Sequence, residues 1–179
     1  MNEVEVRFLE VDVISLQQKL DTLGAKKIYD TILEEWIFKK KEWEPRLGRL
    51  RIRKNNTTVQ IAYKETTQDT SKGNKEIEFH IDTLENALEF VEKMGLTNPR
   101  RQQKRRIAYM LGDVNIDIDF WPQIPPLVEI EAENIGKITA TAKKLGLDMK
   151  DACNLDAFQV ITQIYKVDLP NIQNYIFSS

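Results

Sequence analysis

One short alternating phrase occurs three times along the chain, as Glu3-Val4-Glu5-Val6, Glu76-Ile77-Glu78-Phe79 and Glu129-Ile130-Glu131-Ala132. Each copy is followed by apolar residues at helical spacing and then by a stop, at Leu23-Gly24, Met94-Gly95 and Leu145-Gly146. Strict alternation predicts β-strands, whose successive side chains point to opposite faces. The glutamates of each copy therefore share a face, and clustered carboxylates repel one another. The pattern predicts a sheet whose charged face meets divalent cations or a highly charged ligand.

Length and charge narrow the class of protein. The chain has 179 residues, which suits a single domain over 1–179. Its 26 basic and 28 acidic residues give a net charge of −2, which argues against a general nucleic-acid binder. The single Cys153 excludes a disulfide framework and the single His80 excludes a multi-histidine metal site. With no apolar run of membrane length and no signal-peptide pattern, we expect a cytoplasmic protein without a membrane partner.

Further strands and helices are expected around the three repeats. Strands are predicted near residues 31–39, 49–53, 58–64, 104–111 and 114–120. Helices are predicted to start at the N-cap residues Asp12, Asp82 and Asn154. Another helix is predicted over about residues 135–145. The glycines Gly24, Gly95 and Gly146 are expected to end the first three helices. Residues 166–179 are expected to form a C-terminal tail.

Charges of one sign gather on individual strands. Arg49, Arg51 and Arg53 share a face opposite Leu50 and Ile52. Asp117 and Asp119 likewise lie opposite apolar residues, as do Lys104 and Arg106. An ordinary sheet with one wet side would explain any single strand. The joint pattern indicates instead an α+β fold, in which helices cover the apolar face and the charged face lines a groove or a closed barrel.

Such an interior favours a metal and a phosphate chain together. Acidic clusters prefer hard cations such as Mg²⁺ or Mn²⁺, whose ligands are oxygen atoms. Arginine strands prefer phosphate, because a guanidinium group binds it through two hydrogen bonds. The chain has no Gly-x-x-x-x-Gly-Lys loop, so side chains on strands would hold the phosphates.

The order of these motifs resembles a known family. The matching segments are Glu3-Val4-Glu5-Val6-Arg7, Leu50-Arg51-Ile52-Arg53, Tyr63-Lys64, Lys75-Glu76-Ile77-Glu78, Lys104-x-Arg106, Asp119 and Glu129-Ile130-Glu131. Over roughly residues 1–165 the chain is similar to CYTH proteins, also called triphosphate tunnel metalloenzymes. These include class IV adenylate cyclases, thiamine triphosphatases and inorganic tripolyphosphatases. The resemblance implies an antiparallel β-barrel, the triphosphate tunnel, with a charged interior and helices packed outside.

The resemblance also implies a role for each matching residue. The metal, Mg²⁺ or Mn²⁺, would be held by Glu3, Glu5, Asp119, Glu129 and Glu131. The triphosphate would be bound by Arg7, Arg51, Arg53, Lys64, Lys104 and Arg106. Lys64 and Arg106 would also stabilise charge in the transition state. Glu76 and Glu78 would pair with these cations or hold metal.

Two positions depart from the family pattern. Arg7 replaces the last lysine of the opening motif and cannot accept a proton. Ile37-Phe38 stands where relatives often have Tyr-Phe, which weakens a mechanism that uses this tyrosine to orient water.

Several functions remain open at this point. The leading expectation is a metal-dependent enzyme that cleaves a triphosphate, with ATP, tripolyphosphate or thiamine triphosphate as the substrate. Cyclisation and hydrolysis, the reactions of a lyase and a hydrolase, are both open. A non-catalytic triphosphate-binding module or sensor is the alternative. No nucleic-acid partner is expected, and a homodimer is left open.

Overall fold

The structure is a computed structural model that describes residues 4–46, 48–65 and 75–178. Its fold is α+β and is built on a mainly antiparallel sheet, to which nine strands belong in the described residues. Contacts divide the chain into two compact units, Met1–Thr31 with Arg105–Leu169 and Ile32–Lys104 with Pro170–Ser179. Strands β2 (Lys26–Phe38) and β6 (Arg100–Leu111) each run from one unit into the other.

In the first unit the strands follow the order β1 (Val4–Leu9), β8 (Leu127–Ala132), β7 (Val114–Phe120) and β6. Neighbouring strands are antiparallel, and their register decides which charges meet. Arg7 lies opposite Glu129, Asp117 also lies opposite Glu129, and Arg106 lies opposite Asp119. The alternation predicted from the sequence therefore brings charges from four strands onto one face of this unit.

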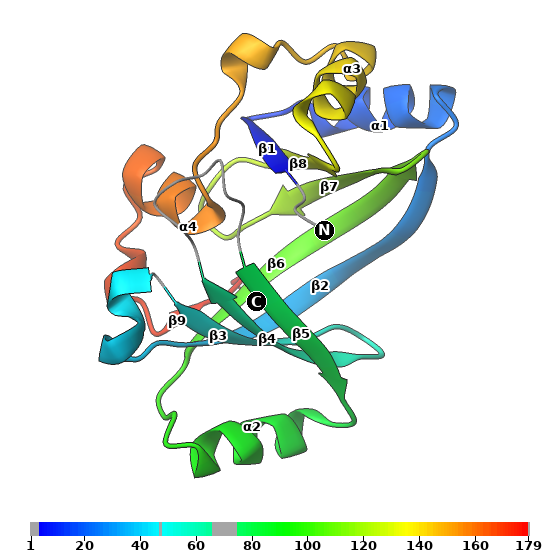
Figure 1. Ribbon diagram of the computed structural model, residues 1–179. Helices are drawn as coiled ribbons and strands as arrows, with labels where there is room; N and C mark the ends of the chain where they lie inside the picture. The colour runs from blue at the N-terminus through cyan, green and yellow to red at the C-terminus, as the bar shows by residue number, and fades with distance from the viewer. Residues whose placement is uncertain (1–3, 47, 66–74, 179) are drawn as a thin grey trace. The chain divides into compact units, whose positions relative to one another are not determined.

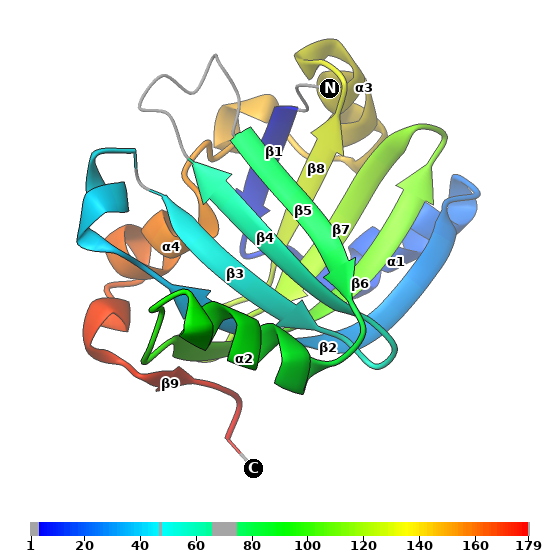
Figure 2. The same ribbon diagram turned by 60° about the horizontal axis from the view of Figure 1, so that its bottom comes forward.

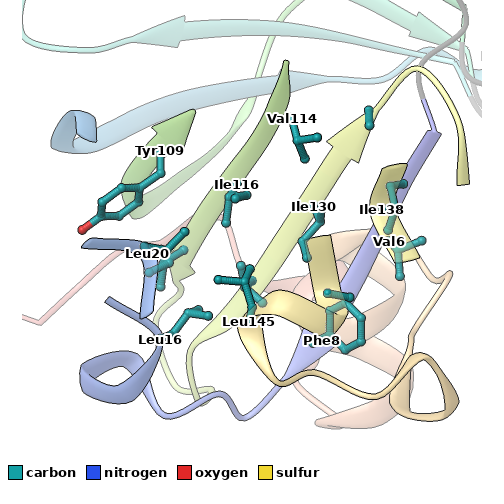
Figure 3. Close-up of a cluster of buried hydrophobic side chains, with 14 of the residues drawn as sticks. Val6, Phe8, Leu16, Leu20, Tyr109, Val114, Ile116, Ile130, Ile138 and Leu145 are labelled. Carbon is teal, nitrogen blue, oxygen red and sulfur yellow. The ribbon is translucent and has the colours of Figure 1, made fainter. Parts of the chain in front are cut away.

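The opposite face of this unit carries its hydrophobic core. Helices α1 (Val13–Thr22) and α3 (Ile135–Leu145) lie against it (Figure 1). Figure 3 shows Leu16 and Leu20 of α1 meeting strand residues such as Ile116 and Ile130. These side chains are fully or almost fully buried, so the helices that follow the first and third glutamate repeats cover the apolar face as expected.

The second unit repeats this plan with other strands. Its sheet has the order β2, β3 (Arg49–Lys54), β4 (Val59–Glu65) and β5 (Lys75–Ile81). Helix α2 (Leu84–Lys93) covers one face of it (Figure 2), where Ala87 and Val91 pack on Ile52 and Ile61. The short 3₁₀ helix η1 (Lys41–Arg46) joins β2 to β3.

The register of the second unit arranges the charges on its other face. Glu35 lies opposite Arg53, and Lys64 lies opposite both Arg49 and Glu76. Cations of β3 and β4 therefore lie beside acids of β2 and β5.

The start of α2 differs from the sequence prediction by one residue. Asp12 is confirmed as the N-cap of α1, since its side chain accepts a hydrogen bond from the Ser15 N–H. At α2 the cap is Thr83 rather than Asp82, because the Thr83 hydroxyl accepts the Asn86 N–H at 3.1 Å. Thr83 has the extended backbone conformation that an N-cap requires.

The last helical region is shorter than predicted. It begins at Asp156 rather than Asn154, because Asp156 and Gln159 form a reciprocal capping box. After α4 (Ala157–Gln159) the chain continues as a π-helix, Val160–Ile164. In the expected C-terminal tail, β9 (Asn174–Tyr175) pairs in parallel with β6, and Tyr175 is buried. Ser179 lies outside the described residues.

Helix α3 offers a test of these local signals. The Asn134 side chain accepts the Lys137 N–H at 3.1 Å, and Gly146 ends the helix with a φ of 72°. Asn134→Ala is expected to lower the free energy of unfolding by about 1 kcal/mol, because one N–H at the helix start loses its acceptor. Urea denaturation measures this loss, with Asn134→Asp as a control that retains the cap. Equal midpoints for the two variants would contradict the assignment.

The expected closed barrel is only partly reproduced. Within the described ranges, β1 has β8 as its one strand neighbour plus a single bridge from Arg7 to Cys153, and β5 has only β4. Backbone hydrogen bonds in the described residues therefore do not close the sheet, and the barrel stays a prediction. None of the helices in this part of the chain has both the length and the apolar character that a membrane crossing needs.

Candidate functional site

Each unit carries one cluster of charged side chains. The acidic cluster of the first unit consists of Glu5, Asp117, Asp119, Glu129 and Glu131 with Arg7 and Arg106. The basic cluster of the second unit consists of Arg51, Arg53, Lys64 and Lys104 with Glu35, Glu76, Glu78 and Gln102. Apart from Glu35 and Gln102, the residues of both clusters lie on the strand faces that the alternation predicted to be charged.

Arg106 joins the carboxylates of two neighbouring strands. Its Nε and Nη2 atoms each donate to one oxygen of Asp119, both at 2.6 Å, and Nη2 also donates to Glu129 at 2.6 Å. Its Nη1 atom pairs with Asp117. Burial alone would lower the Arg106 pKa, but Asp119 and Glu129 outweigh it and hold this pKa well above its ordinary value.

Arg7 lies on β1 and continues this network. Its Nε donates to Glu129 at 2.7 Å, its Nη2 to Glu5 at 3.0 Å and its Nη1 to the Leu155 carbonyl at 2.7 Å. Only 5% of Arg7 is exposed, so it is part of the cluster and not a surface cation. Burial would lower its pKa, but Glu129 and Glu5 raise it above the usual value, so Arg7 stays protonated.

The donor atoms of the acidic cluster fit a hard divalent cation. Five carboxylates face two guanidinium groups, which leaves the cluster with an excess of negative charge. Oxygen-rich sets of this kind are what Mg²⁺ and Mn²⁺ bind in proteins. Within the described residues, however, the acids do not form a ready-made group of ligands, and Arg106 holds oxygens of Asp119 and Glu129.

Most of the expected metal ligands are brought together by the register. Glu5 of β1 lies opposite Glu131 of β8, and Glu129 lies on β8 opposite Arg7. Asp119 is connected to Glu129 by Arg106, which donates hydrogen bonds to both. Glu3 lies outside the described residues, so its placement is not described. Asp117 joins the cluster although it was not among the expected ligands; its signal was the same-face spacing to Asp119.

In the basic cluster, Arg51 has one polar atom without an acceptor among the described residues. Its Nη2 donates to Glu76 at 3.2 Å and to Glu78 at 3.4 Å. Within the described part of the chain its Nε is buried without a hydrogen bond, and the Glu35 oxygen lies 4.0 Å away. Burial, reinforced by Arg53, lowers the pKa of Arg51 to about 10 despite the nearby acids. A buried, unsatisfied cationic donor is what an anion-binding site contains before its ligand arrives.

Glu35 is a site residue that the sequence interpretation missed. It is 3% exposed, and it accepts hydrogen bonds from Arg53 at 2.7 Å and from Gln102 at 2.6 Å. Burial favours the neutral acid, but Arg53, Arg51 and Lys104 outweigh it and hold the Glu35 pKa well below its usual range. Glu35 is therefore the internal anion that keeps these cations together.

The remaining expected residues also lie in the basic cluster. Lys64 pairs with Glu76 at 2.6 Å, while burial and Arg51 together lower the Lys64 pKa. Glu76 contacts Arg51 and Lys64, and Glu78 contacts Arg51. Of the two roles expected for these glutamates, the structure shows the pairing with cations. Ile37 is buried at the position opposite Arg51, so it brings no hydroxyl group to this strand position.

Solved structures with this fold come from several organisms. The PH1012 protein of Pyrococcus horikoshii matches with a TM-score of 0.74 and 25% identity, over 88% of this chain and 98% of that one. A protein titled "putative adenylate cyclase" from Vibrio parahaemolyticus matches with a TM-score of 0.79 and 14% identity, over 90% and 98%.

A third structure is titled as a "putative adenylyl cyclase" from Hippeastrum with a dominant triphosphatase activity. It matches with a TM-score of 0.63 and 15% identity, over 94% of this chain and 99% of that chain. No curated protein sequence gives a significant match. The family model described as the CYTH domain matches residues 1–152, which include every expected site residue. On this match, together with the ordered charged strands, the chain belongs to the CYTH family.

Proposed function

We propose that the protein is a metal-dependent enzyme that binds a triphosphate chain and cleaves it. The observation that carries this proposal is the buried Nε of Arg51, in a strand of arginines, which has no hydrogen-bond acceptor among the residues that the structure describes. Leaving such a donor unsatisfied costs about 1–3 kcal/mol, and a phosphate oxygen would satisfy it. The proposal includes the closed tunnel expected of the family.

The roles follow from the chemistry of each cluster. Arg51, Arg53, Lys64 and Lys104 bind phosphate oxygens, with Arg7 and Arg106 as further cations. Glu3, Glu5, Asp119, Glu129 and Glu131 would hold Mg²⁺ or Mn²⁺, and a bound cation would neutralise charge on the phosphate under attack. Lys64 and Arg106 stabilise charge that develops as the bond breaks.

Catalysis without a protein base is consistent with these residues. Arg7 cannot take a proton, and Ile37 has no hydroxyl group. The attacking group, water or a ribose hydroxyl, would then be activated by position and charge alone. The same two residues favour a second candidate, a triphosphate-binding module without turnover.

One assay separates these functions. The pure protein is incubated with tripolyphosphate, ATP or thiamine triphosphate, with Mg²⁺ and Mn²⁺ in turn, and the products are identified. Orthophosphate indicates a phosphohydrolase, and cyclic AMP with pyrophosphate indicates a cyclase. Binding without any product indicates the binding module. No binding of any triphosphate would overturn the proposal.

The role of Arg51 leads to a prediction for affinity. Arg51→Ala is expected to weaken binding of all three triphosphates by about 1.5–3 kcal/mol, the scale of a charged hydrogen bond, which is roughly 10–150-fold. Titration calorimetry measures this change. Arg105→Ala is the matched control, because Arg105 is exposed and pairs with Asp30. A similar loss in both variants, or no loss in either, would remove Arg51 from the binding site.

A further inference from the structure

The carboxylates of the acidic cluster already have cationic partners. Both oxygens of Asp119 accept hydrogen bonds from Arg106 at 2.6 Å. Glu129 uses one oxygen for Arg106 at 2.6 Å and the other for Arg7 at 2.7 Å. None of the Asp119 side chain is exposed, so water does not compensate its charge. The two arginines do for Asp119 and Glu129 what a bound cation would do, which is to compensate their charge.

A divalent cation cannot simply be added to this arrangement. An ion that coordinates Asp119 and Glu129 would lie within a few ångströms of the guanidinium group that bridges them. Positive charges at that separation repel one another strongly in a buried site. The energy of metal binding must therefore include moving a guanidinium group away from the carboxylates.

Arg106 is better placed to move than Arg7. Within the described part of the chain, every hydrogen bond and ion pair of the Arg106 guanidinium goes to a carboxylate: Asp117, Asp119 or Glu129. A cation that takes over these oxygens removes each attraction that holds Arg106. Arg7 has an additional anchor, the Leu155 carbonyl at 2.7 Å, and metal binding does not remove that contact.

We propose that Arg106 is an internal counter-cation that the divalent metal displaces, and that its released guanidinium group then binds the triphosphate. This inference rests on the proposed function and goes beyond it, because it makes one side chain the link between the two ligands. Each ligand favours the state in which Arg106 has left the carboxylates. Linkage then requires metal and triphosphate to strengthen each other's binding by the same factor.

Calorimetry on variants tests this coupling. Mn²⁺ is titrated alone into wild type, Arg106→Gln and the matched control Arg105→Gln, whose position pairs with Asp30 instead. Arg106→Gln is expected to bind Mn²⁺ about tenfold more tightly than wild type, because the competing cation is gone. Tripolyphosphate is then titrated with and without Mn²⁺, after correction for their complex in solution. The strengthening seen in wild type and Arg105→Gln is expected to be largely lost in Arg106→Gln.

A second measurement covers a variant that fails to fold. In wild-type protein, the side-chain Nε–H signal of Arg106 is followed by NMR while Mg²⁺ alone is added. The chemical shift of the Arg106 Nε–H proton is expected to move away from its hydrogen-bonded value as metal binds. The chemical shift of the Arg7 Nε–H proton is expected to stay unchanged. Arg106→Lys, which retains a charge but cannot bridge three carboxylates, is expected to bind Mn²⁺ more tightly than wild type.

Some outcomes would overturn the inference alone. Metal binding that leaves the Arg106 signal unchanged would do so, as would a folded Arg106→Gln that binds Mn²⁺ no more tightly than wild type. If wild type binds tripolyphosphate but no divalent cation, the inference fails while triphosphate binding stands. If wild type binds neither ligand, the proposed function fails with it.

Discussion

Glu129→Gln is expected to abolish metal-dependent cleavage of every triphosphate. Among the residues that the structure describes, Glu129 is the one acid that contacts both Arg7 and Arg106, so it connects the acids of β1, β7 and β8. An amide keeps the shape of this side chain but carries no charge for a cation. Replacing a residue that only supports a metal ligand costs about 10–100-fold in metal affinity or activity, and loss of a ligand should cost at least that.

The measurement is the rate of product formation at saturating Mg²⁺ or Mn²⁺. Glu131→Gln is expected to behave in the same way, since Glu131 lies beside Glu5 in the register. Glu133→Gln is the matched control, because Glu133 follows the same strand but pairs with Lys137 at the surface. Full activity in both Glu129→Gln and Glu131→Gln, with thermal unfolding confirming folded protein, would show that the carboxylates do not hold the metal.

Much of the fold could be predicted because its signals are local. Alternation places Ile116 and Ile118 in the core and Asp117 and Asp119 on the charged face, and the structure agrees. Gly146 ends α3 with the positive φ that glycine tolerates best. Such signals are read within a few residues, so they do not depend on how distant segments meet.

Helix starts were less secure because adjacent residues compete for the same role. Asp82 and Thr83 can both cap a helix, and only the backbone conformation decides between them. Asn154 and Asp156 present the same ambiguity, which the reciprocal bond to Gln159 resolves in favour of Asp156. Sequence alone gives the presence of these helices but not the first residue of each.

The partners of charged residues could not be predicted from single strands. Glu35 adjoins Glu34 in a segment without clean alternation, so it resembles surface charge. Its role depends on Arg53, which lies 18 residues away in sequence and opposite it in the register. Likewise, the sequence indicates that Arg106 is a functional cation but not that acids hold it.

Glu35→Gln is expected to lower the free energy of unfolding by about 3–5 kcal/mol, the cost of removing one partner from a buried ion pair. The variant would retain a hydrogen-bonding side chain, but Arg53 and Arg51 would lose the buried charge that compensates them. Urea denaturation measures this loss. Glu34→Gln is the matched control, because Glu34 is more exposed and pairs with Arg101 at 3.7 Å, a contact worth about 0–1 kcal/mol.

The pH dependence of stability separates the charge of Glu35 from its packing. Because the folded pKa of Glu35 is lowered from the ordinary 4.5, its stabilisation is fully present above that value and is lost as the pH falls below it. Wild type should therefore lose stability on acidification more steeply than Glu35→Gln, which has no proton to take up at this position. Inorganic tripolyphosphate should restore part of the variant's stability at neutral pH, since a bound anion would compensate the same cations. Equal acid sensitivity in the two proteins, with a loss no greater than that of Glu34→Gln, would show that Glu35 does not hold the basic cluster together.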